Sequence, residues 1–353
     1  MKRQITYANA VLEATMQCME ADPSVYIMGL GVPDPKGVFG TTLGLQKKFG
    51  PGRVLDMPVA ENGMTGIAIG SALAGMRPIM THQRIDFMLL SLDQIINNAA
   101  KWHYMFGSKM SVPLVIRLLV GRGWGQGPQH SQSLQALFAH IPGLKVVMPT
   151  APSDAKGLLI AAIRDNNPVI FIEHRWLHGI SGDVPQELFT VPIGKARIMK
   201  PGRDATVVAS SYATLEVMKA AGLLAKDNID IEIIDLRTIK PLDEEAILAS
   251  LDKTGRLLVV DGAWKSFGVS AEVMALAAEK GFSSLKAAPR RLALPDAPTP
   301  TSKALSDHYY PRTKDIVNEV RCLLNKPKQT EEQLGIDHQT PLDVPDKAFT
   351  GPF

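Results

Sequence analysis

The chain has 353 residues, of which 45% are hydrophobic and 21% are charged, and this is an ordinary globular composition. The length exceeds what one hydrophobic core usually serves, so it predicts two domains. The 38 basic and 35 acidic residues give a net charge of only +3 and form no long basic run, which argues against nucleic acid and a membrane surface as partners.

The N-terminal residues 1–15 lack the apolar core and the small-residue cleavage site of a signal peptide. No apolar stretch approaches the roughly 20 residues that a membrane-spanning helix needs. Cys18 and Cys322 lie far apart in the sequence and form no paired motif, which fits two buried thiols in a reducing compartment. The sequence therefore predicts a soluble, cytoplasmic protein.

Short apolar runs alternate with helical patterns in the first half of the chain. Strands are expected at residues 25–28, 54–57, 112–120, 144–148 and 168–173. Helices are expected at residues 7–19, 63–74, 89–102 and 151–165. This alternation is typical of a parallel sheet with helices on both faces.

A second alternation follows a loosened, Gly- and Pro-containing segment at residues 179–201, which indicates a linker. Its strands are expected at residues 205–210, 229–235, 256–261 and 291–293, and its helices at residues 215–224, 243–251, 269–280 and 313–324. After Lys326 the chain is polar, rich in Pro and without periodicity. The predicted fold is α/β, with two doubly wound domains and an extended or disordered tail.

The chain contains, in this order, the segments GVFGTTLGLQKKFGPGRVLDMPVAENGMTGIAIGSALAGMRPI, LDQIINNAAKWHYMFG, QHSQSLQALFAHIPGLKVVMP, DAKGLLIAAIRDNNPVIFIEH, IDLRTIKPLD and KTGRLLVVD. Together they resemble the beta subunits of the pyruvate, branched-chain and acetoin dehydrogenase complexes, which depend on thiamin diphosphate. The likeness runs through about residues 4–325, and its wider relatives are transketolase and deoxyxylulose-phosphate synthase. It implies a pyrimidine-binding domain at residues 1–185, a linker at 186–200, a transketolase C-terminal-like domain at 201–325 and a tail at 326–353.

Glu61, in PVAENG, matches the cofactor-activating glutamate of this family. Thiamin diphosphate becomes a nucleophile when its own aminopyrimidine, in the imino form, removes a proton from the thiazolium ring. A carboxylate that is hydrogen-bonded to the pyrimidine nitrogen favours that form. The position also suits the task, because strand ends line ligand crevices in open sheets. Taken alone, Glu61 would more readily be an ordinary carboxylate at a helix start.

Two further residues match functional positions of the family. Phe87, in DFMLLSLDQ, corresponds to an aromatic residue that stacks on the aminopyrimidine, although ordinary core packing is the alternative. His130, in GPQHSQS, corresponds to the active-site histidine, which shuttles protons near neutral pH. The Gly-rich stretch before His130 would let the backbone approach a ligand closely.

A potassium site is implied by the likeness to some family members. Its ligands would be oxygen atoms, the type that hard cations prefer. The matching residues are Leu114, Ala162, Ile163, Asp165 and Asn167. The alternative is a helix end that is closed by Asn166 or Asn167 in a left-handed conformation.

The magnesium-binding pattern of the family, GDG followed by an Asn pair, has no counterpart in this sequence. A diphosphate group carries a high negative charge and needs such a metal clamp. The resemblance therefore implies that thiamin diphosphate and magnesium are shared with a separate alpha subunit. The expected assembly is an α2β2 heterotetramer with a beta–beta contact and sites at subunit interfaces, and a lipoyl acyltransferase core is a further expected partner.

Several positions depart from the family pattern. The chain has GLGVPDP where relatives usually carry an acidic pair, and it has His82 and Arg84 in THQRID near the expected cofactor. These two side chains are candidates for binding a carboxylate or a phosphorylated sugar, since Arg suits bidentate contacts with anions. They would equally serve in pairing with Asp86 or in facing the alpha subunit. The departures argue against pyruvate itself as the substrate.

The leading functional hypothesis is a beta subunit of an enzyme that decarboxylates a 2-oxo acid and passes the acyl group to a lipoyl carrier. The alternative is a split transketolase-like carboligase or ketol transferase that acts on an aldehyde or sugar without lipoamide. A non-catalytic scaffold is a third hypothesis, against which the intact Glu61 argues. A nicotinamide-dependent dehydrogenase is disfavoured because no expected strand is followed by GxGxxG.

Overall fold

The structure is a computed structural model that describes residues 3–121 and 126–336. Within these ranges the chain forms two compact units. Unit 1 comprises residues 3–121 and 137–193, and unit 2 comprises residues 126–136 and 194–336. No helix in the described ranges is both long enough and apolar enough to cross a membrane.

Unit 1 is built on a parallel sheet with the strand order β6-β7-β5-β4-β2-β3. The strands are β2 (Val25–Met28), β3 (Val54–Leu55), β4 (Arg77–His82), β5 (Val115–Val120), β6 (Lys145–Val147) and β7 (Val169–His174). All residues of β2 and β5 are buried, as expected for strands that are covered on both faces. Because these strands run in one direction, their carboxyl ends share one edge of the sheet.

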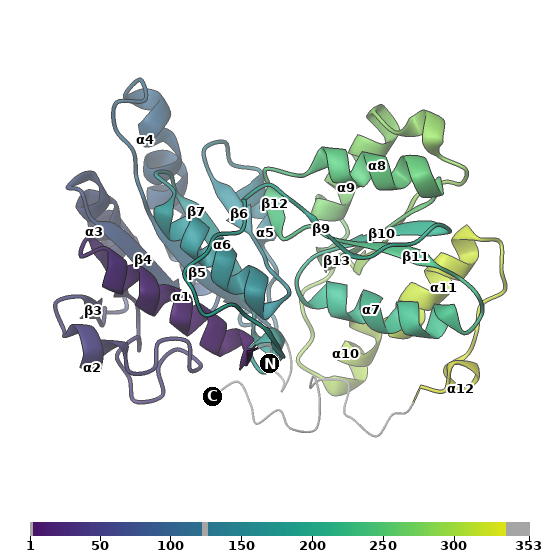
Figure 1. Cartoon of the computed structure of the whole chain (residues 1–353), viewed down its shortest axis with the longest axis horizontal. Helices are drawn as coiled ribbons and strands as arrows, with labels where there is room; N and C mark the ends of the chain where they lie inside the picture. Colours follow the sequence, from purple (N-terminus) through teal and green to yellow (C-terminus); the bar gives the residue numbers. More distant parts are fainter. Residues whose placement is uncertain (1–2, 122–125, 337–353) are drawn as a thin grey trace. The chain divides into compact units, whose positions relative to one another are not determined.

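The main helices of unit 1 begin with ordinary capping residues. The Thr6 side chain caps α1 (Tyr7–Ala21) by accepting a hydrogen bond of 3.2 Å from the backbone of Asn9, and Pro152 opens α6 (Pro152–Arg164). These two helices lie side by side on one face of the sheet (Figure 1). The remaining elements are β1 (Gln4–Thr6), α2 (Leu45–Phe49), α3 (Glu61–Leu73), η3 (Arg175–Leu177) and β8 (Ser181–Asp183), with α5 (Gln135–Ala139) crossing the boundary between the units.

The single helix that periodicity predicts at residues 89–102 is divided into three short pieces. They are the 3-10 helix η1 (Phe87–Ser91), the π-helix η2 (Gln94–Ala99) and α4 (Ala100–Met105). The hydrophobic pattern is correct, but the hydrogen-bonding register changes along the segment. Such π-helical turns occur mostly as local interruptions of α-helices and are frequent near functional sites.

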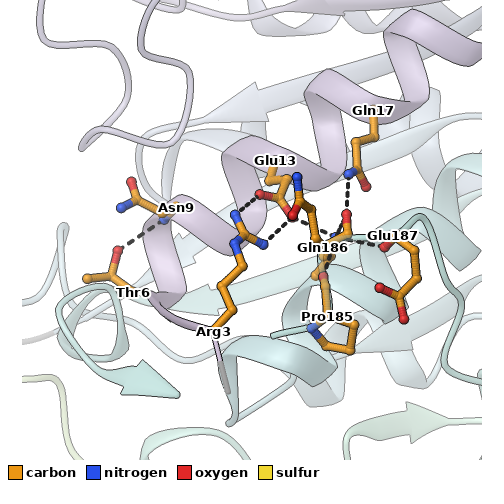
Figure 2. A network of polar contacts seen from close by, with 9 residues as sticks. Arg3, Thr6, Asn9, Glu13, Gln17, Pro185, Gln186 and Glu187 are labelled. Atoms are coloured by element: carbon orange, nitrogen blue, oxygen red, sulfur yellow. Dashed lines mark hydrogen bonds and ion pairs between the residues drawn. The ribbon is translucent and has the colours of Figure 1, made fainter. Parts of the chain in front are cut away.

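A polar network holds the α1–α6 pair to the segment that leaves unit 1 (Figure 2). The Lys156 ammonium is fully buried and donates to the Glu13 carboxylate at 2.6 Å and to the carbonyl oxygens of Pro185, Gln186 and Glu187 at 2.7, 3.0 and 2.9 Å. Arg3 approaches the same Glu13 carboxylate with two guanidinium nitrogens. One buried cation therefore satisfies acceptors from two separate parts of the chain.

Unit 2 contains a five-stranded sheet with the order β14-β13-β10-β11-β9, in which only the edge strand β9 is antiparallel. The strands are β9 (Arg197–Lys200), β10 (Ala205–Ala209), β11 (Ile231–Asp235), β13 (Leu257–Trp264) and β14 (Arg290–Leu294). Figure 1 shows α7 (Tyr212–Ala225) and α11 (Thr313–Leu323) on one face and α8 (Glu244–Thr254) and α9 (Val269–Glu279) on the other. The helices on both faces of this sheet confirm the predicted α/β fold, with a second doubly wound domain.

Unit 2 also has short elements where the sequence predicts irregular chain. Strand β9 lies inside the predicted linker at residues 186–200, and α12 (Glu331–Leu334) lies inside the predicted tail. Leu334 is only 7% exposed and joins the core formed by α7 and α11, so the chain after Lys326 first packs onto the domain. The rest of the predicted tail, residues 337–353, lies outside the described ranges. The other short elements are β12 (Thr238–Lys240), η4 (Phe282–Ser284) and α10 (Lys303–Tyr309).

Candidate active site

Glu61 is the first residue of α3 and follows the sheet edge at which β3 ends. A carboxylate in the first turn of a helix is stabilised by the helix dipole. Glu61 as a whole is only 7% exposed. Within the described ranges its backbone oxygen accepts a hydrogen bond from Thr65, but its side chain makes none. The Glu61 carboxylate oxygens are not among the fully buried atoms without a partner, so they remain open to a hydrogen-bond donor from another molecule.

Phe87 belongs to the same unit and begins η1, five residues after the end of β4. Its ring is half-buried. Its backbone N–H donates to the Arg84 carbonyl oxygen at 3.3 Å, which fixes the turn between the strand and the 3-10 helix. Phe87 is thereby held near the carboxyl edge of the sheet, as Glu61 is.

His82 and Arg84 are both buried at the end of β4, with exposed fractions of 3% and 7%. Burial lowers the pKa of His82 to about 4, so its imidazole is neutral near pH 7. In the described part of the chain, its Nε2 atom has no hydrogen-bonding partner. Burial also lowers the pKa of Arg84, and the nearby Asp86 carboxylate partly offsets this effect.

A buried ion pair that the sequence analysis missed lies beside these residues. The Arg117 guanidinium binds both carboxylate oxygens of Glu173, at 2.7 and 3.1 Å, and donates to the Thr41 hydroxyl at 2.9 Å. His178 Nε2 lies 3.3 Å from the Glu173 carboxylate. Burial alone would raise the pKa of Glu173, but Arg117 and His178 lower it to about 2. The available signal was a charged residue within each of two otherwise apolar strands, β5 and β7.

Arg175 was also missed, although it directly follows β7. Its guanidinium carbon lies 4.8 Å from the centre of the Phe39 ring, and that of Arg84 lies 5.4 Å from the same centre. A Cβ atom on Gly121 would lie 3.1 Å from the Arg175 Cβ, so the glycine leaves room for the arginine stem. Arg84, Arg175 and Phe39 therefore form one cluster, called here the arginine–phenylalanine cluster.

His130 lies in unit 2, whereas Glu61, Phe87, His82 and Arg84 lie in unit 1. It is exposed in a turn, and its backbone N–H donates to the Gly127 carbonyl oxygen at 3.4 Å. The following residues are anchored within unit 2, because the Gln135 side chain donates to the Asp261 carboxylate at 3.1 Å. Part of the Gly-rich stretch before His130, residues 122–125, lies outside the described ranges.

The oxygens expected to bind potassium already accept hydrogen bonds. One Arg77 nitrogen donates to the carbonyl oxygens of both Ile163 and Asp165, at 3.1 Å each, and Lys145 pairs with the Asp165 carboxylate. The other expected ligands are similarly engaged: the Ala162 oxygen accepts from Asp165 N, the Leu114 oxygen accepts from Val169 N, and Asn167 N donates to the Asp165 carboxylate. A potassium ion would have to share these oxygens with two cationic side chains, and the site stays a prediction.

Comparison with known proteins gives two family matches. The model described as the transketolase pyrimidine-binding domain matches residues 3–179, and the model of the transketolase C-terminal domain matches residues 194–316. A solved split-gene transketolase, described as an inactive beta4 tetramer, superposes with a TM-score of 0.75 over 92% of this chain and 99% of that chain. Its sequence identity is 20%, so this likeness concerns the fold.

Curated relatives are more similar in sequence. The beta subunit of acetoin:2,6-dichlorophenolindophenol oxidoreductase from Cupriavidus necator is 44% identical over 91% of this chain and 98% of the relative. The corresponding subunit from Bacillus subtilis is 41% identical over 93% of this chain and 99% of the relative. The mitochondrial beta subunit of the pyruvate dehydrogenase E1 component from Bos taurus is 41% identical over 91% of each chain.

Proposed function

Because the chain belongs to the family of transketolase-type beta subunits that includes those of the acetoin and pyruvate dehydrogenases, we propose that Glu61, Phe87 and His130 are its active-site residues. The chain is the beta subunit of a thiamin-diphosphate-dependent enzyme of the 2-oxoacid dehydrogenase type and works with an alpha subunit. The names of the curated relatives favour this function over a split transketolase.

The observation that carries the assignment of the site is Glu61, a largely buried residue at a helix start whose carboxylate has no side-chain hydrogen bond in the described residues. When bound, thiamin diphosphate supplies the nucleophilic carbon that attacks the substrate carbonyl. The role of Glu61 is to accept a hydrogen bond from the protonated pyrimidine ring and so to stabilise its positive charge. Phe87 orients the ring by stacking, and His130 holds or moves a proton at a substrate oxygen.

The diphosphate end and its magnesium ion are proposed to be held by the alpha subunit, because this sequence lacks the GDG pattern that forms the clamp. The proposed assembly is an α2β2 heterotetramer with a beta–beta contact. Support for a partner surface comes from α3, where Ile67 is 59% exposed and Cβ atoms added at Gly63 and Gly70 would meet nothing within 4 Å. Exposed apolar side chains beside open glycines allow another chain to approach closely.

We further propose that the acyl group passes to a lipoyl carrier and that a lipoyl acyltransferase core binds the assembly. The cytoplasm is the proposed location, because both cysteines are free thiols, which is usual in reducing compartments. His82 and Arg84 are proposed to face the substrate, since both are buried polar residues at the end of a parallel strand.

The function is tested by combining the beta chain with its separately purified alpha subunit, thiamin diphosphate and magnesium. A panel of 2-oxo acids and acetoin is supplied with 2,6-dichlorophenolindophenol, the dye that the relatives' names give as electron acceptor. We expect substrate-dependent dye reduction by the mixture and none by either subunit alone. Transfer of a ketol group to an aldehyde without dye reduction would instead support the split transketolase.

A further inference from the structure

The turn that carries His130 lies in the sequence between β5 and β6 of unit 1, yet the described residues 126–136 belong to unit 2. His130 itself is exposed, whereas Gly127, Ser131 and Gln135 around it are buried. A loop that carries a functional side chain is usually positioned by a rigid scaffold beneath it. The contacts of the buried neighbours identify the part of unit 2 that serves as this scaffold.

Asp261, in the second half of β13, is the main anchor of the segment. Its Oδ1 atom accepts hydrogen bonds from the Gln135 side-chain Nε2 and from the Ala263 backbone N–H, both at 3.1 Å. Its Oδ2 atom accepts a hydrogen bond of 3.1 Å from the backbone N–H of Ser270, in the first turn of α9. One buried carboxylate therefore joins the chain after His130 to a strand and to a helix start of the C-terminal domain.

The hydrogen bond between Gln135 and Asp261 is the single polar contact of the Gln135 side chain within the described ranges, because its Oε1 atom has no partner there. Burial raises the pKa of Asp261, and the hydrogen bonds from Ser270, Ala263 and Gln135 oppose this rise. Each donor to a buried carboxylate replaces water that the site excludes. Loss of the Gln135 donor therefore weakens this anchor without breaking another side-chain hydrogen bond of Gln135.

The turn also meets the chain that follows β14. The buried Thr299 hydroxyl donates to the Ser131 carbonyl oxygen at 3.5 Å. Gly127 has a φ angle of 69°, and a Cβ atom at this position would collide with the Thr301 Oγ1 atom. Glycine is the residue that combines a positive φ angle with such a close approach. His130 therefore lies between two residues that both contact the C-terminal domain.

We propose that Asp261 and Gln135 are positioning residues of the active site, which fix the turn of His130 and so determine where its imidazole meets the substrate. The inference rests on the proposed function, because it assumes that His130 is an active-site residue. Neither Asp261 nor Gln135 needs to touch the substrate. A displacement of about 1 Å in a proton-transferring group can cost about 100-fold in rate, so the anchor affects catalysis through geometry alone.

The test replaces Gln135 by Met, which keeps most of the side-chain volume and removes the N–H donor. The variant is combined with the alpha subunit, thiamin diphosphate and magnesium, and sedimentation measures the assembly. In the dye assay we expect kcat to fall roughly 10- to 100-fold while KM changes by less than about 2-fold, because the substrate still binds when the imidazole is displaced. The matched control is Gln186→Met, since Gln186 is an exposed glutamine of unit 1, and it should keep the wild-type kcat.

A double-mutant cycle with His130→Ala shows whether Gln135 acts through His130. If it does, Gln135→Met lowers kcat when His130 is present and has no further effect in the His130→Ala background. Equal losses of kcat in both backgrounds would give Gln135 a general structural role and overturn the proposal. An unchanged kcat for Gln135→Met would overturn it as well.

Hydrogen exchange, followed by mass spectrometry on the assembled enzyme, tests the anchor without turnover. Amides of residues 126–136 should exchange roughly 10-fold faster in Gln135→Met and at the wild-type rate in Gln186→Met. Thr299→Val removes the contact to Ser131 and should act in the same direction. Wild-type exchange rates in both Gln135→Met and Thr299→Val would show that these contacts do not fix the turn.

The proposed function and this inference fail differently. If the wild-type mixture reduces no dye with any substrate, the proposed function is lost, and the exchange rates still decide whether Asp261 and Gln135 hold the turn. A wild-type kcat for His130→Ala refutes the proposed role of His130 itself. A reduced kcat for His130→Ala, together with unchanged exchange in Gln135→Met, refutes only the positioning role.

Discussion

Glu173 carries its charge in a fully buried position, where only a matched cation makes the charge tolerable. Arg117 supplies that cation through two hydrogen bonds, at 2.7 and 3.1 Å. Replacing Glu173 by Gln leaves the Arg117 charge buried without its counter-charge, which typically costs about 3–5 kcal/mol. Urea unfolding at pH 7 should show this loss for Glu173→Gln. The control Glu187→Gln changes an exposed side chain and should leave the unfolding midpoint in place.

The same ion pair predicts a pH dependence of stability. The pKa of Glu173 is about 2 in the folded state, below the ordinary value of 4.5. Its contribution is therefore fully present above about pH 4.5 and is lost as the pH falls towards 2. The acid unfolding curve of Glu173→Gln should lack this component. Parallel acid curves for the variant and the wild type would show that the pair does not control acid stability.

His82 predicts a loss of stability in a different pH range. Its pKa is lowered from 6.5 to about 4 in the folded state, so the unfolded chain binds the proton more readily below pH 6.5. Stability should fall between pH 6.5 and 4 by an amount on the order of 3 kcal/mol. The variant His82→Phe should show a flatter profile of unfolding free energy against pH. The control His140→Phe, at an exposed position, should keep the wild-type slope.

The α1–α6 pair depends on the buried Lys156, which contacts one carboxylate and three carbonyl oxygens. Lys156→Met keeps most of the side-chain volume but leaves the three carbonyl oxygens without this donor. We expect a loss of about 3 kcal/mol in the free energy of unfolding. Denaturant unfolding beside the exposed control Lys47→Met measures it. Equal midpoints for the two variants would mean that the network does not stabilise the fold.

Periodicity predicted most of the larger elements, because their hydrophobic patterns reflect burial directly. Helix α1 and strands β2, β5 and β7 lie where the sequence predicts them, within a few residues. Strand β4 was missed, since its sequence RPIMTH begins and ends with polar residues and contains Pro78. The predicted helix at residues 89–102 was wrong in its regularity, because periodicity detects the buried side and not the hydrogen-bonding register.

The candidate site was only partly predictable for a related reason. Four residues of the site stand out in the sequence. Glu61 and Phe87 lie in motifs of the family, whereas His82 and Arg84 depart from the family pattern near a strand end. Arg175 and Phe39 are separated by more than a hundred residues, and the segments that carry them are brought together by the parallel pairing of β2, β4, β5 and β7. The order of the strands in a sheet is difficult to derive from a single sequence. The contact between Arg175 and Phe39 could therefore be recognised only in the structure.

At the scale of the whole molecule, the chain supplies two transketolase-type domains without the metal-binding pattern of the family. The proposed active site therefore depends on two polypeptides, one that holds the pyrimidine ring and one that holds the diphosphate. Single-chain preparations are expected to lack turnover even when fully folded. A self-sufficient enzyme would turn over without a second polypeptide, and a scaffold would not turn over even with one.

Replacing Glu61 in the assembled enzyme tests the proposed function most directly. Wild type and Glu61→Gln are each combined with the alpha subunit, thiamin diphosphate and magnesium, and dye reduction is measured alongside sedimentation of the complex. We predict that the variant assembles normally while kcat falls by about 100-fold or more, because an amide does not stabilise the protonated pyrimidine as a carboxylate does. Normal assembly with unchanged kcat would contradict the central claim.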